Sequence, residues 1–161
     1  MVDKDSAGVS FPPPLAFVGV LLAGLAIDHF LWWRVRIPFG HWLEHSLGWL
    51  LLVAGAAILL TAAGLFRKAG TDVKPWKATT RIVTDGVYRW TRNPMYLGMT
   101  LAYAGIALIA DSLIALALLV PLVLVIQDRV IAREEAYLDA KFGDEYRRYK
   151  ARVGRWFGTK G

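Results

Sequence analysis

Residues 95–127 read MYLGMTLAYAGIALIADSLIALALLVPLVLVIQ, and this stretch decides the fold. It holds two apolar runs, 95–110 and 112–127, and only an aspartate and a serine mark their junction. Aspartate and serine favour turns and helix caps, while apolar runs of this kind are typical of helices in a bilayer. The pattern therefore predicts a tight helical hairpin in a membrane. Its second helix can lengthen past Asp128 and should bend at Pro121, because a proline inside a helix removes a hydrogen bond.

Two further apolar runs precede the hairpin, at 15–33 and 47–66. Both come close to the roughly 20 residues that a helix needs to cross the hydrocarbon core. The apolar residues, 56% of the chain, are bunched into such runs rather than spread with the period of a soluble helix or strand. Asp28 and His29 interrupt the first run, and we expect them near a membrane interface. The prediction is an all-α polytopic membrane protein, a single domain over 1–161 with about four transmembrane helices. The expected spans are 15–33, 45–66, 94–110 and 112–128.

The composition excludes several kinds of site. The chain has no cysteine, so disulfides, thiolate nucleophiles and thiolate metal ligands are excluded. His41 and His45 are spaced to share a helix face, but no carboxylate completes a His-Glu-x-x-His pattern, and we expect no metal site. The net charge is +6 and the basic residues flank the apolar runs. Membrane lipids with anionic headgroups are therefore the expected partners, and nucleic acid is not.

The distribution of Lys and Arg predicts the orientation in the membrane. Seven of these residues lie in 67–92 and nine lie after Gln127, whereas the hairpin tip at Asp111 has none. Because positive loops stay in the cytoplasm, we expect 67–93, the C-terminal tail and the N-terminus on that side. Arg34 and Arg36 fall on the opposite side, but the asymmetry elsewhere is larger. The expected location is the inner membrane of a prokaryote, multi-pass, with the active site facing the cytoplasm.

The polar segments 67–93 and 129–157 contain more apolar and aromatic residues than a passive linker would. The first combines turn formers with apolar side chains, namely Gly70, Pro75, Gly86 and Asn93 with Trp76, Ile82, Val83, Val87, Tyr88 and Trp90. In the second, the pattern predicts a helix over 128–142 that stops at Gly143 and a further helix from Asp144. Tyr146, Tyr149 and Val153 would share one face of that last helix.

Three pieces of sequence stand in order around the hairpin. They are TRIVTDGVY at 80–88, RNPMYLG at 92–98, and REE at 133–135 followed by FGDEY at 142–146. Taken together, they resemble the isoprenylcysteine carboxyl methyltransferase family, which shares the pattern with phospholipid methyltransferases. Each piece alone is common, but the ordered set with a membrane hairpin between its halves is specific. The resemblance covers residues 67 to 156.

The resemblance implies methyl transfer from S-adenosylmethionine to a lipophilic, membrane-partitioned acceptor. That acceptor is either an isoprenylcysteine-like carboxylate or a phospholipid-like amine. An enclosed cofactor site is implied at the cytoplasmic ends of the last two spans, in 67–93 and 129–157. The residues that the resemblance places at the cofactor are Thr80, Arg81, Ile82, Val83, Tyr88, Arg92, Asn93, Pro94, Met95, Tyr96, Gly98 and Glu134.

These residue types suit a cofactor that carries a carboxylate, an ammonium group and a sulfonium. Asn93 can cap a helix with Pro94 in its first position, and that helix end presents free N–H groups to a carboxylate. Glu134 can accept hydrogen bonds from ribose hydroxyls or from the ammonium. Tyr88 offers an aromatic face to a sulfonium, as does Tyr96. Gly98, which has no side chain, permits a close approach to the backbone.

Two departures from the family pattern concern the chemistry. Many members have histidine before the proline, where this chain has Asn93, which keeps a hydrogen-bonding side chain without an ionisable group. Eukaryotic isoprenylcysteine enzymes place a carboxylate-binding arginine one turn before the glutamate, where this chain has Val130. Arg129 and Arg133 are therefore candidates to hold an acid. Glu135 is the candidate base for an amine acceptor, which must first lose a proton.

Two other functions compete with methyl transfer. Membrane sterol reductases look similar at their cytoplasmic end and use NADPH, but they have more spans than the four expected here. A small membrane scaffold or transporter is the non-enzymatic alternative, and the aromatic-rich polar segments argue against it. Binding of S-adenosylmethionine would discriminate among the three.

Overall fold

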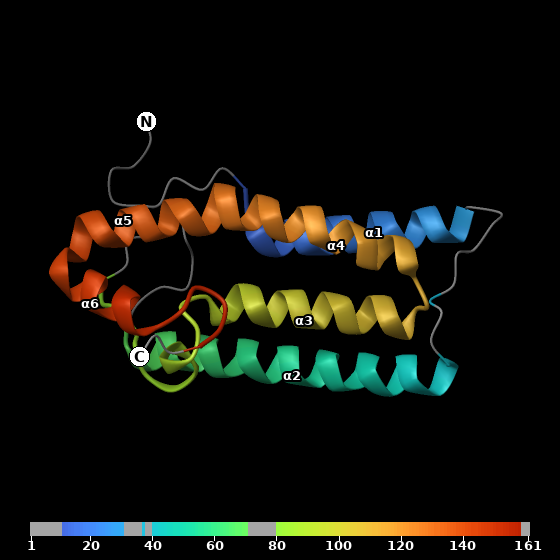
Figure 1. Ribbon diagram of the computed structural model, residues 1–161, viewed down its shortest axis with the longest axis horizontal. Coiled ribbons are helices and arrows are strands. Elements are labelled where there is room, and N and C mark those ends of the chain that lie inside the picture. Colours follow the sequence, from blue (N-terminus) through green and yellow to red (C-terminus); the bar gives the residue numbers. More distant parts are fainter. Residues whose placement is uncertain (1–10, 31–36, 38–39, 71–79, 159–161) are drawn as a thin grey trace. The chain divides into compact units, whose positions relative to one another are not determined.

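The computed structural model describes residues 11–30, 37, 40–70 and 80–158, and these are predominantly helical (Figure 1). No β-strand occurs within these ranges. In order, the elements are α1 (Pro13–Phe30), α2 (His41–Lys68), the 3-10 helix η1 (Gly86–Arg89), α3 (Pro94–Ile109), α4 (Leu113–Ile126), the π-helix η2 (Gln127–Ile131), α5 (Ala132–Phe142) and α6 (Asp144–Arg152). Four residues named above from the sequence lie outside the described ranges: Arg34, Arg36, Pro75 and Trp76.

The four expected apolar helices are all present. Three helices are long and apolar enough to cross a bilayer: Pro13–Phe30, His41–Lys68 and the continuous Leu113–Phe142. The fourth, α3, has 16 residues and is shorter, as the short run in the sequence implies. Backbone polar groups in a bilayer must be satisfied within the chain, and a helix achieves this for every residue in its interior. These helices confirm the prediction of an all-α membrane protein.

The chain divides into two compact units. One, the hairpin unit, consists of Phe11–Ala57 and Gly98–Ile126. The other, the loop unit, contains the described residues of Ile58–Leu97 and Gln127–Gly161. All the polar contacts described for the candidate site lie within the loop unit.

The hairpin unit contains the predicted tight turn. Asp111 has a positive φ of 49°, and the Ser112 N–H donates to the Ala107 carbonyl at 2.9 Å, which closes the end of α3. The Ser112 hydroxyl accepts a hydrogen bond from the Ala115 N–H at 3.1 Å and so caps α4. Its hydroxyl also donates to the buried carboxylate of Asp28 on α1. Asp28 is therefore a paired group, held at the turn of the hairpin.

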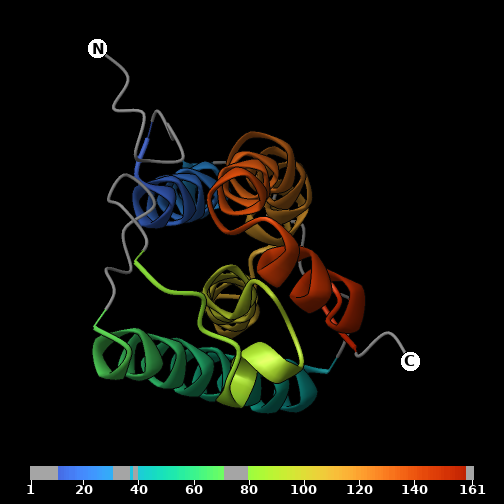
Figure 2. The same ribbon diagram turned by 90° about the vertical axis from the view of Figure 1, so that its left-hand side faces the viewer.

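Small residues let the helices of the hairpin unit approach closely. Figures 1 and 2 both show α1 beside α4, where a Cβ on Gly24 would lie 2.7 Å from the Cα of Ala115. Between α2 and α3, a Cβ on Gly55 would lie 2.6 Å from the Gly98 carbonyl oxygen. Helix association in membranes relies on such contacts, because lipid tails are as apolar as the side chains that they surround.

The loop unit contains the two helices that the sequence predicts in its C-terminal segment, one ending before Gly143 and one starting at Asp144. Helix α5 ends at Phe142, Gly143 has a φ of 52°, and α6 starts at Asp144. Tyr146 and Tyr149 form the buried face of α6, and Val153 follows directly after the helix as its C-cap residue. These three residues are clustered, and Ile82, Leu138 and Phe142 pack against them. The π-helix η2, which joins α4 to α5, was not predicted. Its wider turn changes the direction in which the following side chains leave the helix.

Candidate active site

The loop before α3 is held by the segment that follows α6. The Arg92 N–H donates to the Gly154 carbonyl at 3.0 Å. The Thr91 hydroxyl donates to the Arg155 carbonyl at 3.2 Å and the Asn93 side-chain amide donates to the same oxygen at 3.1 Å. Asn93 lies directly before α3, whose first residue is Pro94, as the sequence predicts. The start of α3 is therefore fixed from a point more than 60 residues away in the chain.

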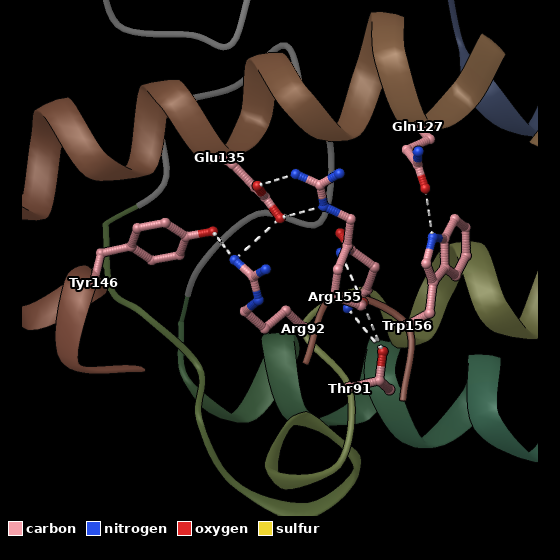
Figure 3. A network of polar contacts seen from close by, with 8 residues as sticks. Thr91, Arg92, Gln127, Glu135, Tyr146, Arg155 and Trp156 are labelled. Atoms are coloured by element: carbon pink, nitrogen blue, oxygen red, sulfur yellow. Dashed lines mark hydrogen bonds and ion pairs between the residues drawn. The ribbon is translucent and has the colours of Figure 1, made fainter. Parts of the chain in front are cut away.

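Glu135 is the centre of a buried ionic network. The Arg155 guanidinium grips both carboxylate oxygens, with Nε 3.0 Å from Oε1 and Nη2 2.7 Å from Oε2. Nη1 of Arg92 lies 3.0 Å from the same Oε1. It also lies 3.4 Å from the Tyr146 hydroxyl. Figure 3 shows the two arginines converging on Glu135, with Tyr146 beside Arg92.

Arg92 keeps one buried donor without a partner. Its Nε is buried and makes no hydrogen bond with the described part of the chain. Only 5% of the Arg92 side chain and 8% of the Glu135 side chain are exposed. Arg155 keeps 36% of its side chain exposed, so its charge is partly hydrated. A buried N–H donor without an acceptor is costly, so Nε of Arg92 suits an oxygen of a bound molecule.

A second polar pair links α3 to α5. The Tyr96 hydroxyl donates to Oε1 of Glu134 at 2.6 Å. Glu134 lies on the charged helix α5, beyond the apolar helix α4. Burial raises the pKa of the Glu134 carboxyl to about 7, the hydrogen bond from Tyr96 lowers it, and the nearby charge of Glu135 raises it. A cationic or hydroxyl partner would therefore stabilise the ionised form of this carboxylate, because it would replace the water that burial has removed.

Tyr88 lies between these groups and the C-terminal helix. Its carbonyl accepts a hydrogen bond from the Tyr149 hydroxyl at 2.7 Å, and its ring is 5.5 Å from that of Phe66. Burial raises the pKa of the Tyr88 phenol, and the neighbouring Tyr149 and Glu134 raise it further. Tyr88 is therefore a neutral aromatic group near a carboxylate.

The residues predicted at the cofactor fall into different surroundings. Tyr88, Asn93, Pro94 and Tyr96 are buried, and Ile82, Val83, Arg92, Met95 and Glu134 are half-buried, all within the loop unit. Thr80 and Arg81 belong to the same unit but are exposed. Gly98 belongs to the hairpin unit, where Gly55 of α2 approaches its backbone. The structure thus gives Gly98 a role in helix packing, and its role at a cofactor stays a prediction.

The residues predicted for catalysis also differ in position. Arg129 and Arg133 are exposed, and Val130 between them is fully buried. The guanidinium groups described at Glu135 are those of Arg92 and Arg155. Glu135 itself is buried, and both of its oxygens already accept from guanidinium groups. Its role as a base stays a prediction, and its contacts suggest a different role.

Four residues that contribute polar contacts here were not predicted from the sequence. Thr91 and Arg155 connect the loop to α5, and the Trp156 indole donates to the Gln127 side chain of η2 at 2.8 Å. Arg155 reads in the sequence as one more basic residue of a positive tail. Only the folded structure, in which the segment after α6 lies against α5, reveals that Arg155 forms an ion pair with the buried carboxylate of Glu135. Among the described residues, no group of three or more His, Asp or Glu side chains could hold a metal ion.

The fold and site together define a class: an all-α membrane protein with a buried arginine–glutamate network where α3 and α5 begin. The sequence model of the phospholipid methyltransferase family matches residues 43–145, so the chain belongs to that family. An uncharacterized protein of Haemophilus influenzae is 47% identical over 67 residues, which are 42% of this chain and 81% of that protein.

A second relative is a named enzyme. Protein-S-isoprenylcysteine O-methyltransferase of Schizosaccharomyces pombe is 32% identical over 72 residues. These residues are 45% of this chain but only 30% of the yeast protein, so the similarity covers a part of that enzyme. No solved structure matches the chain. The resemblance stated from the sequence pieces is confirmed, and the chain is a membrane protein of a methyltransferase family.

Proposed function

We propose that this protein transfers a methyl group from S-adenosylmethionine to a lipophilic acceptor that reaches the site from the membrane. The observation that carries the proposal is the buried, unpartnered Nε of Arg92, on the loop that the family model covers. A carboxylate is the ligand group that would complete this arginine. Glu134 provides the opposite charge on the neighbouring helix, so the two side chains match a molecule with both a carboxylate and an ammonium group.

The residues present fit the amino-acid part of the cofactor. Arg92 would hold the carboxylate together with the positive N-terminal end of α3. Glu134 would accept from the ammonium or from ribose hydroxyls, and Tyr88 would contribute an aromatic face. S-adenosylmethionine, when bound, would supply a methyl group on a sulfonium. The acceptor would take this methyl group while S-adenosylhomocysteine leaves, so no covalent enzyme intermediate is needed. The chain's task is then to orient both molecules and to exclude water.

Glu135 is better suited to holding Arg92 than to removing a proton. Both of its oxygens accept from guanidinium groups, so a proton from an acceptor would have to displace an ion pair. An acceptor that is already a nucleophile, such as a carboxylate, needs no base. An amine acceptor would need one, and water would compete with Glu135 for that role, because Glu134 is assigned to the cofactor.

The family description and the residues near Glu134 both bear on the methyl acceptor. The family is that of phospholipid methyltransferases, and the yeast relative is named for isoprenylcysteine. Val130 is fully buried and apolar, so it cannot replace a carboxylate-binding arginine, while Arg129 and Arg133 are exposed. We therefore favour a lipid amine or another small lipophilic nucleophile over a prenylated cysteine carboxylate.

Ligand binding tests the cofactor. The purified protein in detergent should be titrated with S-adenosylmethionine, S-adenosylhomocysteine and NADPH. The proposal expects saturable binding of the first two and none of NADPH. Binding of NADPH alone would support the reductase alternative, and binding of none of the three would support a scaffold or transporter.

Initial rates test the acceptor. A prenylcysteine analogue and a phosphatidylethanolamine-like amine should be compared in the wild type, Arg129→Ala and Arg133→Ala. We expect the amine to be the better acceptor and its rate to be insensitive to both substitutions. Efficient turnover of the prenylcysteine, undiminished in both variants, would show that another group holds its carboxylate.

A further inference from the structure

The C-terminal clasp, residues 153–158, contacts both segments that carry the proposed cofactor residues. Its backbone carbonyls at Gly154 and Arg155 accept from the loop residues Arg92, Thr91 and Asn93. The Arg155 side chain pairs with Glu135 of α5, and Trp156 pairs with Gln127 of η2. The N–H of Gly154 donates to the Gly158 carbonyl at 2.7 Å, which folds the clasp back on itself. The clasp is thus an ordered part of the site.

Arg155 binds the Glu135 carboxylate through two nitrogens. Its planar guanidinium takes both carboxylate oxygens at once, the strongest geometry for this kind of pair. Arg92 can therefore share only Oε1 of Glu135, through its Nη1, and its Nε is left without a partner. A carboxylate that lost Arg155 would be free to turn and to take Arg92 through Nε and Nη2, the same edge of the guanidinium by which Arg155 now holds it. Nε of Arg92 would then be engaged inside the protein.

We propose that Arg155 is a positioning residue, which holds Glu135 so that Nε of Arg92 stays available to the bound molecule. This inference rests on the proposed function and adds a residue that does not itself touch the cofactor. In this proposal the clasp contributes to the affinity for the cofactor. The direct electrostatic interaction between Arg155 and the cofactor would be small, because the charge of Arg155 is paired with Glu135. The role is one of competition between two arginines for one carboxylate.

The test uses Arg155→Met, which keeps an unbranched side chain but removes the charge. The full-length protein in detergent is titrated with S-adenosylhomocysteine, and its thermal unfolding is measured in parallel. We expect Arg155→Met to weaken binding on the order of tenfold, the loss of one charge-assisted hydrogen bond. Arg152→Met is the matched control, because Arg152 is exposed on α6 and its described hydrogen bond goes to the Arg148 carbonyl of the same helix. This control should bind as the wild type does.

A second substitution separates positioning from simple support of the fold. Adding Glu135→Gln to Arg155→Met removes the carboxylate that would capture Arg92, so affinity should recover by several-fold relative to Arg155→Met. If the role were structural, the double variant would bind no better than the single one. If Arg155→Met does not fold, Arg155→Lys, with and without Glu135→Gln, serves the same comparison, because lysine keeps the charge but cannot grip both oxygens.

The outcomes are distinct. Wild-type affinity in Arg155→Met, or no recovery in the double variant, would overturn the positioning role while leaving the proposed function intact. Absence of binding in the wild type would instead overturn the proposed function.

Discussion

At the scale of single residues, Glu134 is the carboxylate on which cofactor affinity should depend most. It accepts from the Tyr96 hydroxyl at 2.6 Å, and it lies on the helix turn that also carries Glu135. Glu134→Gln keeps the shape of the side chain and removes its charge. A hydrogen bond to a charged group contributes about 1.5–3 kcal/mol, so affinity for S-adenosylmethionine should fall on the order of tenfold to a hundredfold. Isothermal titration of the purified variant measures this directly.

The control for this change is Glu145→Gln. Glu145 is an exposed glutamate in the first turn of α6, and its substitution removes the same charge away from the site. It should leave affinity unchanged. Wild-type affinity in both Glu134→Gln and Asn93→Ala would remove these two residues from the cofactor site.

The pH dependence of binding should report the same carboxyl group. Its pKa is raised to about 7, so it becomes protonated as the pH falls below 7. Only the ionised form attracts a cationic ammonium, so affinity should be full well above pH 7 and decrease as the pH is lowered through about 7 towards 5.5. In the free protein the sign is opposite: a raised carboxyl pKa means that stability is lost as the pH rises through about 7. Binding titrations at several pH values should show the decrease in the wild type, and a persistent decrease in Glu134→Gln would assign it to another group.

At the scale of elements, the close contact of α2 with α3 depends on glycine. A Cβ on Gly55 would lie 2.6 Å from the Gly98 oxygen and 2.7 Å from the Ala102 nitrogen, both backbone atoms that cannot swing aside. Gly55→Ala should therefore force the helices apart and destabilise the protein by about 1–3 kcal/mol. We expect a lower midpoint of thermal unfolding in detergent.

Gly64 provides the matched control on the same helix. A Cβ there would meet nothing within 4 Å. Gly64→Ala should leave the midpoint unchanged or raise it, since alanine favours a helix over glycine by about 1 kcal/mol. Equal midpoints for the two variants would contradict the importance of this helix contact.

At the scale of the whole molecule, the open question is which end of the helices faces the cytoplasm. The basic residues of the loop and tail predict that α6 lies there and that the hairpin tip lies on the opposite side. Because the chain has no cysteine, single cysteines can report both positions. Ala151→Cys on α6 and Ala110→Cys at the tip are both exposed sites. An impermeant thiol reagent added to intact cells should label Ala110→Cys and spare Ala151→Cys, and the reverse pattern would invert the topology.

Much of the fold follows from the sequence by itself. The apolar runs predict the four helices because hydrophobic transfer acts on each segment separately, whatever its neighbours are. Asp111, Ser112 and Gly143 predict a turn, a cap and a helix end because these depend on backbone geometry within a few residues. The shared face of Tyr146, Tyr149 and Val153 follows from helical periodicity alone. Family membership also came from ordered local motifs.

Only the tertiary structure decided how the charged residues are paired. From the sequence, Arg92 was a candidate for the cofactor, Arg129 and Arg133 were candidates for an acid, and Arg155 was no candidate at all. Nothing local distinguishes an arginine that meets Glu135 from one that meets solvent. The structure places Arg92 and Arg155 on Glu135, leaves Arg129 exposed, and assigns Gly98 to helix packing. An ion pair requires two segments, distant in sequence, to be brought within hydrogen-bond distance, and that position is a property of the folded chain. For the same reason the C-terminal clasp, whose residues contact a loop some 60 positions earlier, could not be predicted from its own sequence.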